Sequence, residues 1–190
     1  MTMKRLNPKR ITIQRPVAFI VLVIAVCLCG VIGFRLGQTM GHTTSEQLNP
    51  APDFTIPLYS GGPGNFTLSD HRGSPIVLNF WGAWCPPCRS EFPAIQSIAS
   101  QFKDKGVLIV GVNAGGIVRD TEREAKDFLA QEEITFFTGP DSTGNISLDY
   151  QLTKMPTTFF ITRSGTIYKR WEGPITESRL AIFVKELLKL

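Results

Sequence analysis

The segment that most constrains the fold is "PIVLNFWGAWCPPCRSEFP", which runs from Pro75 to Pro93. It begins with a near-continuous apolar run, as expected for a central strand that is covered on both faces. It continues into a predicted helix from about Cys85 to Phe102, whose apolar side chains recur at helical spacing on one face. Two cysteines, Cys85 and Cys88, therefore lie where a buried strand gives way to a helix. A chain with this junction is expected to fold as an α/β protein.

Further predicted elements continue the alternation of strands and helices. Short strand and turn pieces precede the junction in "DFTIPLYS" and "NFTLSDHRG", and a second buried strand follows in "VLIVGVNA". After it come an amphipathic helix in "DTEREAKDFLAQEE", opened by Asp120 or Thr121, and a short helical piece in "SLDYQL". The chain ends with two strands in "TTFFITRSGTIYKRWEG" and a helix capped by Thr176. This order predicts a mixed central sheet with helices on both faces.

Positive charge is concentrated at the N-terminus. Six of the 20 Lys and Arg side chains lie in the first 35 residues, which contain no acid. The other 14 basic residues are therefore set against all 16 acids, which leaves a net charge of −2 beyond residue 35. This balance gives no indication of nucleic acid binding. By the positive-inside rule, residues 1–15 are predicted to form a basic cytoplasmic N-terminus.

Residues 16–34, "PVAFIVLVIAVCLCGVIGF", form a run of 19 residues without a charge. As a helix this run would extend about 28 Å, close to the ~30 Å hydrocarbon core of a bilayer. A cleaved signal peptide is the alternative, but its apolar region is normally about 7–15 residues long and precedes an A-x-A-like site, which does not follow here. The sequence therefore predicts one transmembrane anchor, a linker at 35–50, and an extracytoplasmic domain at 51–190.

Cys27 and Cys29 lie within the predicted anchor. Positions two apart on a helix point about 200° away from each other, so these two cysteines are not expected to pair. We interpret them as small apolar residues in lipid. With four cysteines in 190 residues, a disulfide scaffold is not expected either.

The chemistry is expected at Cys85 and Cys88. The N-terminus of a helix presents unpaired N–H groups and a positive partial charge, which stabilise a thiolate at Cys85. Cys88, three residues on along the same helical face, can act as the resolving partner. Pro86 and Pro87 are tolerated because first-turn N–H groups have no helical partner. A zinc site would need further ligands, and a permanent disulfide this short would constrain little of the unfolded chain. A redox-active dithiol without metal or other cofactor is therefore favoured.

Four motifs occur in order along the exported part: "LNFWGAWCPPCRSEFP", "VGVNAGG", "MPTTFFITRSGTI" and "WEG". With these motifs, residues 51–190 resemble the TlpA/ResA branch of membrane-anchored, thioredoxin-like thiol–disulfide oxidoreductases. The resemblance implies a thioredoxin-like fold with an N-terminal β-extension. It also implies that Cys85 is the attacking nucleophile and Cys88 the resolving thiol.

The same resemblance points to the residues that contact substrate. Pro156 matches the cis-proline of the family, whose loop lies beside the dithiol and pairs with the substrate backbone. Met155 precedes it in the same loop. Trp84 directly precedes Cys85, and it is expected to cover the site rather than react. Pro86 and Pro87 lie between the two cysteines. We expect these five residues to bind substrate.

A departure from ordinary thioredoxins occurs at Asn79, where thioredoxins have a buried aspartate. An amide cannot accept the proton of Cys88, so another base is needed. Glu91 lies one helical turn beyond Cys88 and matches the acid of the "CxxExP" pattern of the ResA group. We predict that Glu91 is this base, shielded by Phe92 and Trp84, which would raise its pKa. The alternative is an exposed helix glutamate.

The expected direction of electron flow follows from the compartment. Disulfides are the default product outside the cytoplasm, so a tethered dithiol is more useful as a supplier of electrons. The resemblance implies reduction of specific exported disulfides, above all the CxxCH motif of apocytochrome c, with electrons from a membrane thiol transporter of the CcdA/DsbD type. General envelope disulfide exchange or oxidation stays open, because the sequence does not determine the dithiol potential. A copper-delivery protein and a non-catalytic scaffold module on the same fold are further alternatives.

Overall fold

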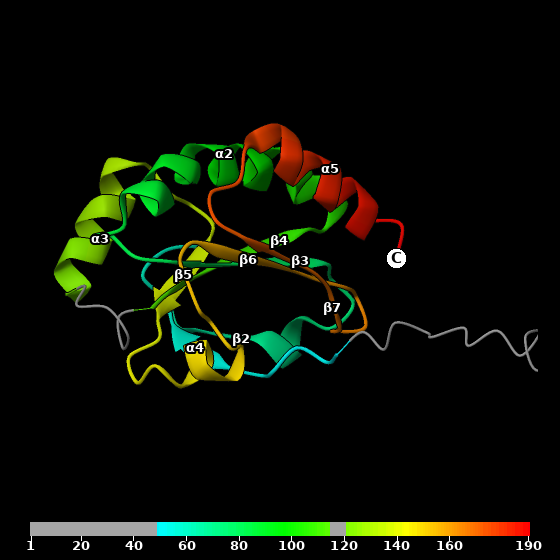
Figure 1. The fold of residues 1–190 in the computed structure, drawn as a ribbon, viewed down its shortest axis with the longest axis horizontal. Helices are drawn as coiled ribbons and strands as arrows, with labels where there is room; N and C mark the ends of the chain where they lie inside the picture. Colours follow the sequence, from blue (N-terminus) through cyan, green and yellow to red (C-terminus); the bar gives the residue numbers. More distant parts are fainter. Residues whose placement is uncertain (1–48, 115–120) are drawn as a thin grey trace, which may run out of the picture. The chain divides into compact units, whose positions relative to one another are not determined.

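The computed structural model describes residues 49–114 and 121–190. A five-stranded sheet forms the centre, with its strands in the order β5-β4-β3-β6-β7 (Figure 1). The strands are β1 Thr55–Pro57, β2 Asn65–Thr67, β3 Ile76–Trp81, β4 Leu108–Asn113, β5 Phe137–Pro140, β6 Thr157–Ile161 and β7 Ile167–Glu172. The helices are α2 Pro86–Phe102, α3 Glu122–Gln131, α4 Asn145–Asp149 and α5 Glu177–Leu187, with the 3-10 helices η1 Leu68–His71 and η2 Lys103–Lys105. Since β3 pairs in parallel with β4 and antiparallel with β6, the sheet is mixed, as predicted.

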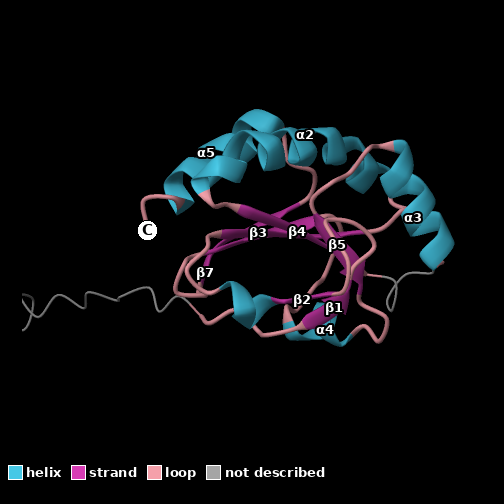
Figure 2. Cartoon of the chain, turned by 180° about the vertical axis from the view of Figure 1, so that it is seen from behind, coloured by secondary structure: helices cyan, strands magenta, loops and turns pink. Residues whose placement is uncertain are grey.

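Both faces of the sheet are covered. The helices α2, α3 and α5 lie on one face, and α4 lies with the β1–β2 hairpin on the other (Figure 2). Each face has its own apolar cluster, and the alternation of side chains along β3 contributes to both. Val77 and Trp81 pack on the α2 side, whereas Leu78 and Phe80 pack on the opposite side. Asn79 is in register with Val77 and Trp81, so its side chain also points toward α2.

β5 is a strand that the sequence pattern did not predict. Its four residues include a glycine and a proline, which are typical of a turn. They form a strand because they align in parallel with β4, from Val110 opposite Phe137 to Asn113 opposite Pro140. Ser60 of the N-terminal extension adds an antiparallel bridge to this strand. The pairing is thus decided by segments distant in sequence.

The predicted caps and the last hairpin are confirmed. Thr121 opens α3 with a capping box, in which its side chain accepts the N–H of Glu124 and the Glu124 carboxylate accepts the N–H of Thr121. Asp120, the other predicted cap, lies outside the described residues. Thr176 caps α5, and a turn at residues 163–165 joins β6 to β7.

Several predictions fall on residues that the structure does not describe. The cytoplasmic N-terminus, the anchor with Cys27 and Cys29, and nearly all of the linker belong to residues 1–48. Within residues 49–114 and 121–190, the helices are too short or too polar to cross a membrane. The anchor and the topology stay predictions.

Candidate active site

The junction of β3 and α2 holds the two cysteines at one end of the sheet. β3 ends at the fully buried Trp81, and a short loop leads to Cys85. The N–H of Cys85 donates to the carbonyl of Gly82 at 3.1 Å, which closes this loop into a turn. Cys85 is then the N-cap of α2, and its Sγ accepts the N–H of Cys88 at 3.3 Å. Strand end, turn and helix start therefore position the pair together.

Cys85 and Cys88 are joined by a disulfide, and their Cα atoms are 5.3 Å apart. Pro86 and Pro87 occupy the first turn between them, where their missing N–H groups cost no helical hydrogen bond. The first turn of α2 carries no acidic side chain, so no carboxylate there competes for the positive end of the helix. The predicted ring at the helix N-terminus is confirmed.

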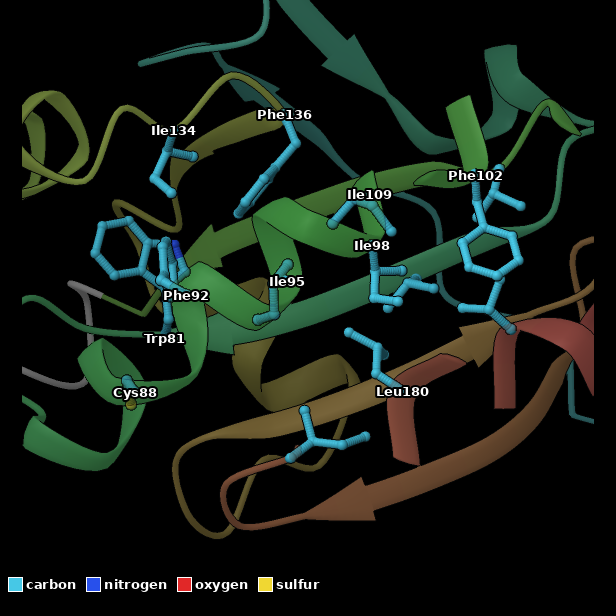
Figure 3. Packing of buried hydrophobic residues seen from close by; sticks show 14 of the residues in the cluster. Trp81, Cys88, Phe92, Ile95, Ile98, Phe102, Ile109, Ile134, Phe136 and Leu180 are labelled. Carbon is cyan, nitrogen blue, oxygen red and sulfur yellow. The ribbon is translucent and has the colours of Figure 1, made fainter. Parts of the chain in front are cut away.

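Both cysteines are buried. Cys88 has no exposed surface and Cys85 retains 3% exposure. Figure 3 shows Cys88 at one end of the apolar cluster, in the same region as Trp81 and Phe92. Both cysteines are therefore buried in the disulfide form, and the prediction that Cys85 is the attacking residue depends on its position at the N-cap of α2.

We expect iodoacetamide to alkylate Cys85 before Cys88 in the reduced protein near neutral pH. Cys85 lies at the helix N-terminus, which stabilises a thiolate, while Cys88 is enclosed by the core. Mass spectrometry of the proteolytic peptide after brief labelling gives the order, and urea-denatured protein is the control in which both thiols react alike. Preferential labelling of Cys88 would contradict the assignment of roles.

Side chains with accessible surface surround the disulfide. Trp84 is 51% exposed, and Pro86 and Pro87 are also exposed. Met155 is half-buried and packs against the apolar cluster that contains both cysteines. The peptide bond from Met155 to Pro156 is cis, as the resemblance implied, and Pro156 is buried.

The Pro156 loop is brought to the disulfide by the pairing of β6 with β3. Thr157, the first residue of β6, is aligned with Phe80, which is one residue before the end of β3. Pro156 therefore lies at the end of the sheet where the loop to Cys85 begins. The predicted substrate-binding residues therefore lie at the end of the sheet that holds the disulfide.

A hollow of about 280 Å³ lies between α3 and the segment that joins β3 to α2, and its position was not predicted from the sequence. The guanidinium of Arg89 lies 4.7 Å from the centre of the Phe128 ring and donates to the carbonyl of Ala83 at 3.4 Å. The hollow is lined by Ala83, Trp84, Arg89, Glu124, Asp127, Phe128 and Gln131. The hollow therefore joins the segment just before Cys85 to α3.

Glu91 is buried in the same helix as the disulfide. It follows Cys88 by one turn and retains 3% exposure. Its carboxylate accepts hydrogen bonds from Nδ2 of Asn79 at 2.8 Å and from the backbone N–H of Ile175 at 2.9 Å. Burial raises the pKa of Glu91 from 4.5 to about 7, against these two hydrogen bonds, which lower it. The carboxyl group can therefore exchange a proton near neutral pH.

The burial of Glu91 is confirmed. Of the two side chains expected to shield the carboxyl group, Phe92 is fully buried and Trp84 is half exposed. The hydrogen bonds from Asn79 and Ile175 further enclose the carboxylate between α2, β3 and the segment before α5. The alternative of an exposed glutamate is excluded by this position.

Asn79 is the site residue that the sequence pattern left without a role beyond its difference from aspartate. Its polar side chain interrupts the run IVLNFW in a strand that is buried throughout. A buried amide normally has hydrogen-bond partners, and this was the signal that the sequence contained. In the structure, Nδ2 donates to Glu91 and, at 3.1 Å, to Oγ1 of Thr158.

Similar proteins of known families agree with a thiol–disulfide site. The AhpC/TSA family profile matches residues 48–170. The thiol-disulfide oxidoreductase ResA of Bacillus thuringiensis subsp. konkukian is 31% identical over 170 residues, which cover 87% of this chain and 94% of the relative. ResA of Bacillus subtilis is 30% identical over 160 residues, covering 84% of this chain and 86% of the relative. The chain belongs to the AhpC/TSA family, and within it to the ResA-type thiol–disulfide oxidoreductases.

Solved structures place this ResA-type chain in the thioredoxin-like fold. StoA from Bacillus subtilis matches with a TM-score of 0.61 at 27% identity, covering 71% of this chain and 99% of that chain. A Chlorobium tepidum protein assigned as the thiol:disulfide interchange protein DsbE matches with a TM-score of 0.65 at 33% identity, covering 74% and 96%. The predicted fold class is confirmed for the described part of the chain.

The redox centre of this ResA-type oxidoreductase is the Cys85–Cys88 pair itself. Within residues 49–114 and 121–190, there is no group of three or more His, Cys, Asp or Glu side chains that could hold a metal ion. Thiol–disulfide exchange needs no further group, because the two electrons are carried by the sulfur atoms.

Proposed function

We propose that this ResA-type oxidoreductase is a membrane-anchored, extracytoplasmic reductase of specific exported disulfides. The observation that carries the direction is the buried carboxyl group of Glu91, one turn from Cys88. A carboxylate near a thiol disfavours the thiolate. The reduced enzyme is therefore less stable than a reduced enzyme whose thiolate is flanked by cations. Strong oxidants of this fold have the opposite property, a stabilised reduced form. Glu91 therefore supports a protein that gives electrons away.

The reaction runs in two exchange steps. The Cys85 thiolate attacks a substrate disulfide, a bond forms between Cys85 Sγ and one substrate sulfur, and the other substrate sulfur leaves as a thiolate. Cys88 then gives its proton to Glu91 and attacks Cys85 Sγ. This forms the Cys85–Cys88 disulfide and releases the second substrate thiolate. The substrate gains two electrons and the enzyme loses two.

The substrate we propose is the CxxCH disulfide of apocytochrome c before haem attachment. The reduced enzyme would be restored by a membrane thiol transporter of the CcdA/DsbD type, which exchanges its own thiols with the Cys85–Cys88 disulfide. Support comes from the similarity to ResA proteins over most of both chains. The exposed Trp84, Pro86 and Pro87, together with the half-buried Met155 and the buried Pro156, are the residues that would meet the substrate.

A redox titration of the full chain against thiol–disulfide buffers tests the direction. We expect a potential closer to the about −270 mV of thioredoxin than to the about −120 mV of DsbA. A value near that of DsbA would overturn the reductase direction and would favour oxidation of envelope thiols.

Peptide disulfides test the substrate. We expect the reduced enzyme to reduce an oxidised CxxCH peptide faster than a peptide of the same composition with altered cysteine spacing. The rates are measured by stopped-flow Trp fluorescence, with insulin as an unrelated disulfide. Equal rates with all three would remove apocytochrome c as the specific substrate and would leave general disulfide exchange.

Protease accessibility tests the location. We expect protease added to spheroplasts to digest residues 51–190, because five cations precede the apolar run at 16–34 and favour a cytoplasmic N-terminus. A cytoplasmic marker protein must survive in the same sample. A domain that is digested after lysis, but protected before it, would place the dithiol in the cytoplasm.

A further inference from the structure

Three elements converge on the Glu91 carboxylate. Glu91 itself belongs to α2, Asn79 to β3, and the N–H of Ile175 to the connection between β7 and α5. Asn79 is also aligned with Thr158 in the pairing of β3 with β6, and the two side chains are hydrogen-bonded. The position of the carboxylate therefore depends on the packing of the sheet as well as on its own helix.

The side-chain amide of Asn79 is arranged as a double donor. Nδ2 donates to Glu91 Oε1 at 2.8 Å and to Thr158 Oγ1 at 3.1 Å. Its Oδ1 is buried and has no hydrogen-bond partner among the described residues. A buried carbonyl without a partner is unfavourable, so this orientation must be stabilised by the bonds that Nδ2 donates. A hydrogen bond to an ionised carboxylate is the stronger kind.

We propose that Asn79 is a positioning residue for the resolving step: its Nδ2 holds the Glu91 carboxylate beside Cys88 and stabilises the ionised form that accepts the Cys88 proton. This inference rests on the proposed role of Glu91 as the proton acceptor. An aspartate at position 79 would instead place a second carboxyl group within hydrogen-bond distance, and the two would share a proton. An apolar residue would leave Ile175 as the remaining donor of the pair seen here.

Charged groups on the surrounding elements are engaged elsewhere. At the start of α5, Glu177 accepts hydrogen bonds from Ser97 and Gln101. At the end of β7, Glu172 pairs with Lys154 and Arg170. The groups that donate to the Glu91 carboxylate from β3 and from the β7–α5 connection are neutral. On α2, Cys88 lies one turn before Glu91, and the guanidinium of Arg89 lies over the Phe128 ring. Burial and the two donors therefore dominate the proton affinity of Glu91.

The test separates the two chemical steps in the reduced full chain, purified in detergent. Dithiobis(nitrobenzoate) reacts first at Cys85 and releases one coloured thiolate. The attack of Cys88 on the resulting mixed disulfide releases the second, so the second phase reports the resolving step. In Asn79→Leu we expect the pH midpoint of the second phase to rise by about one unit, with an about fivefold lower rate at pH 7, because loss of the donor raises the pKa of Glu91. The first phase should keep its rate.

Two further variants make the result decisive. Asn79→Asp keeps the size of the side chain and should also raise the midpoint, so it decides the matter if the leucine variant does not fold. Thr138→Val is the matched control: it removes a different fully buried, hydrogen-bonded polar group of the same sheet, a hydroxyl bonded to Trp81 and Gly111. It should lower stability and leave the midpoint unchanged.

Glu91→Gln distinguishes failure of this inference from failure of the proposed function. If Glu91→Gln keeps the wild-type profile, Glu91 is not the proton acceptor. If Glu91→Gln abolishes the transition while both Asn79 variants keep the wild-type midpoint, Asn79 has no positioning role. In the Glu91→Gln background, Asn79→Leu should produce no further change in the profile, and an independent shift there would overturn the inference.

Discussion

Cys88→Ser is expected to stop the enzyme after a single attack on its substrate. Cys85 can still form the mixed disulfide, because it keeps its thiol and its position as the N-cap of α2. Serine has no thiol to attack the Cys85 sulfur, so the second exchange cannot occur. The product should therefore not exceed one equivalent per protein molecule, whereas the wild-type enzyme turns over repeatedly with a reductant. Non-reducing mass spectrometry measures the trapped adduct.

The same variant identifies the physiological partners. Expressed in the native membrane, Cys88→Ser should accumulate substrate proteins on Cys85, released by reductant. Cys85→Ser is the matched control and should trap none through this site. Repeated turnover by Cys88→Ser, or equal trapping by both variants, would contradict the assignment of Cys85 as nucleophile and Cys88 as resolving thiol.

Glu91→Gln is expected to slow the resolving step by about tenfold or more, toward the ~10²–10⁴ typical of general acid–base groups. The glutamine keeps the size of the side chain but cannot accept a proton. In the wild-type enzyme the pKa of Glu91 is raised to about 7 by burial, so the rate of the step should rise as the pH increases through 7. The variant should lack this rise. Rates of mixed-disulfide resolution between pH 6 and 8 measure both effects.

A surface glutamate provides the control for this experiment. Glu122→Gln removes an exposed carboxylate of α3 that pairs with Lys126, and it should leave the rate and the pH profile unchanged. Wild-type rates in Glu91→Gln across this pH range would show that the Cys88 proton goes to water instead.

Burial of Glu91 also predicts a pH dependence of stability. Its pKa is higher in the folded protein than the ordinary 4.5, so its contribution is fully present below about pH 4.5 and is lost as the pH rises through 7. The corresponding loss is about 3 kcal/mol at most, and Glu91→Gln should reduce it. Urea unfolding at pH 5 and pH 8 measures the difference. An equal loss of stability in the variant would mean that other groups cause it.

Local patterns were sufficient to predict the junction that carries the chemistry. The apolar run of β3, the cysteines at the start of α2 and the helical spacing of its apolar face are properties of short segments. The same is true of the caps at Thr121 and Thr176, whose hydrogen bonds join residues three apart. Such features depend on backbone geometry that neighbours in sequence impose on each other.

Other features depended on segments that meet only in the folded chain. β5, with its glycine and proline, is a strand because β4 and Ser60 pair with it. Local sequence alone favours a trans bond before Pro156, because X–Pro bonds are mostly trans. The cis bond that the structure contains was implied only by the family resemblance. The hydrogen bonds that Asn79 and Ile175 donate to Glu91 were not predicted, because both donors are distant from Glu91 in sequence.

The sequence by itself determined the fold class, the two cysteines and their order, and the helical turn that brings Glu91 near Cys88. The tertiary structure alone decided that the Glu91 carboxylate is held by Asn79, 12 residues away, and by Ile175, 84 residues away. The physical reason is that desolvation and hydrogen bonding set the proton affinity of a carboxylate. Both are properties of the packed sheet and helices, and a short segment of sequence does not contain them.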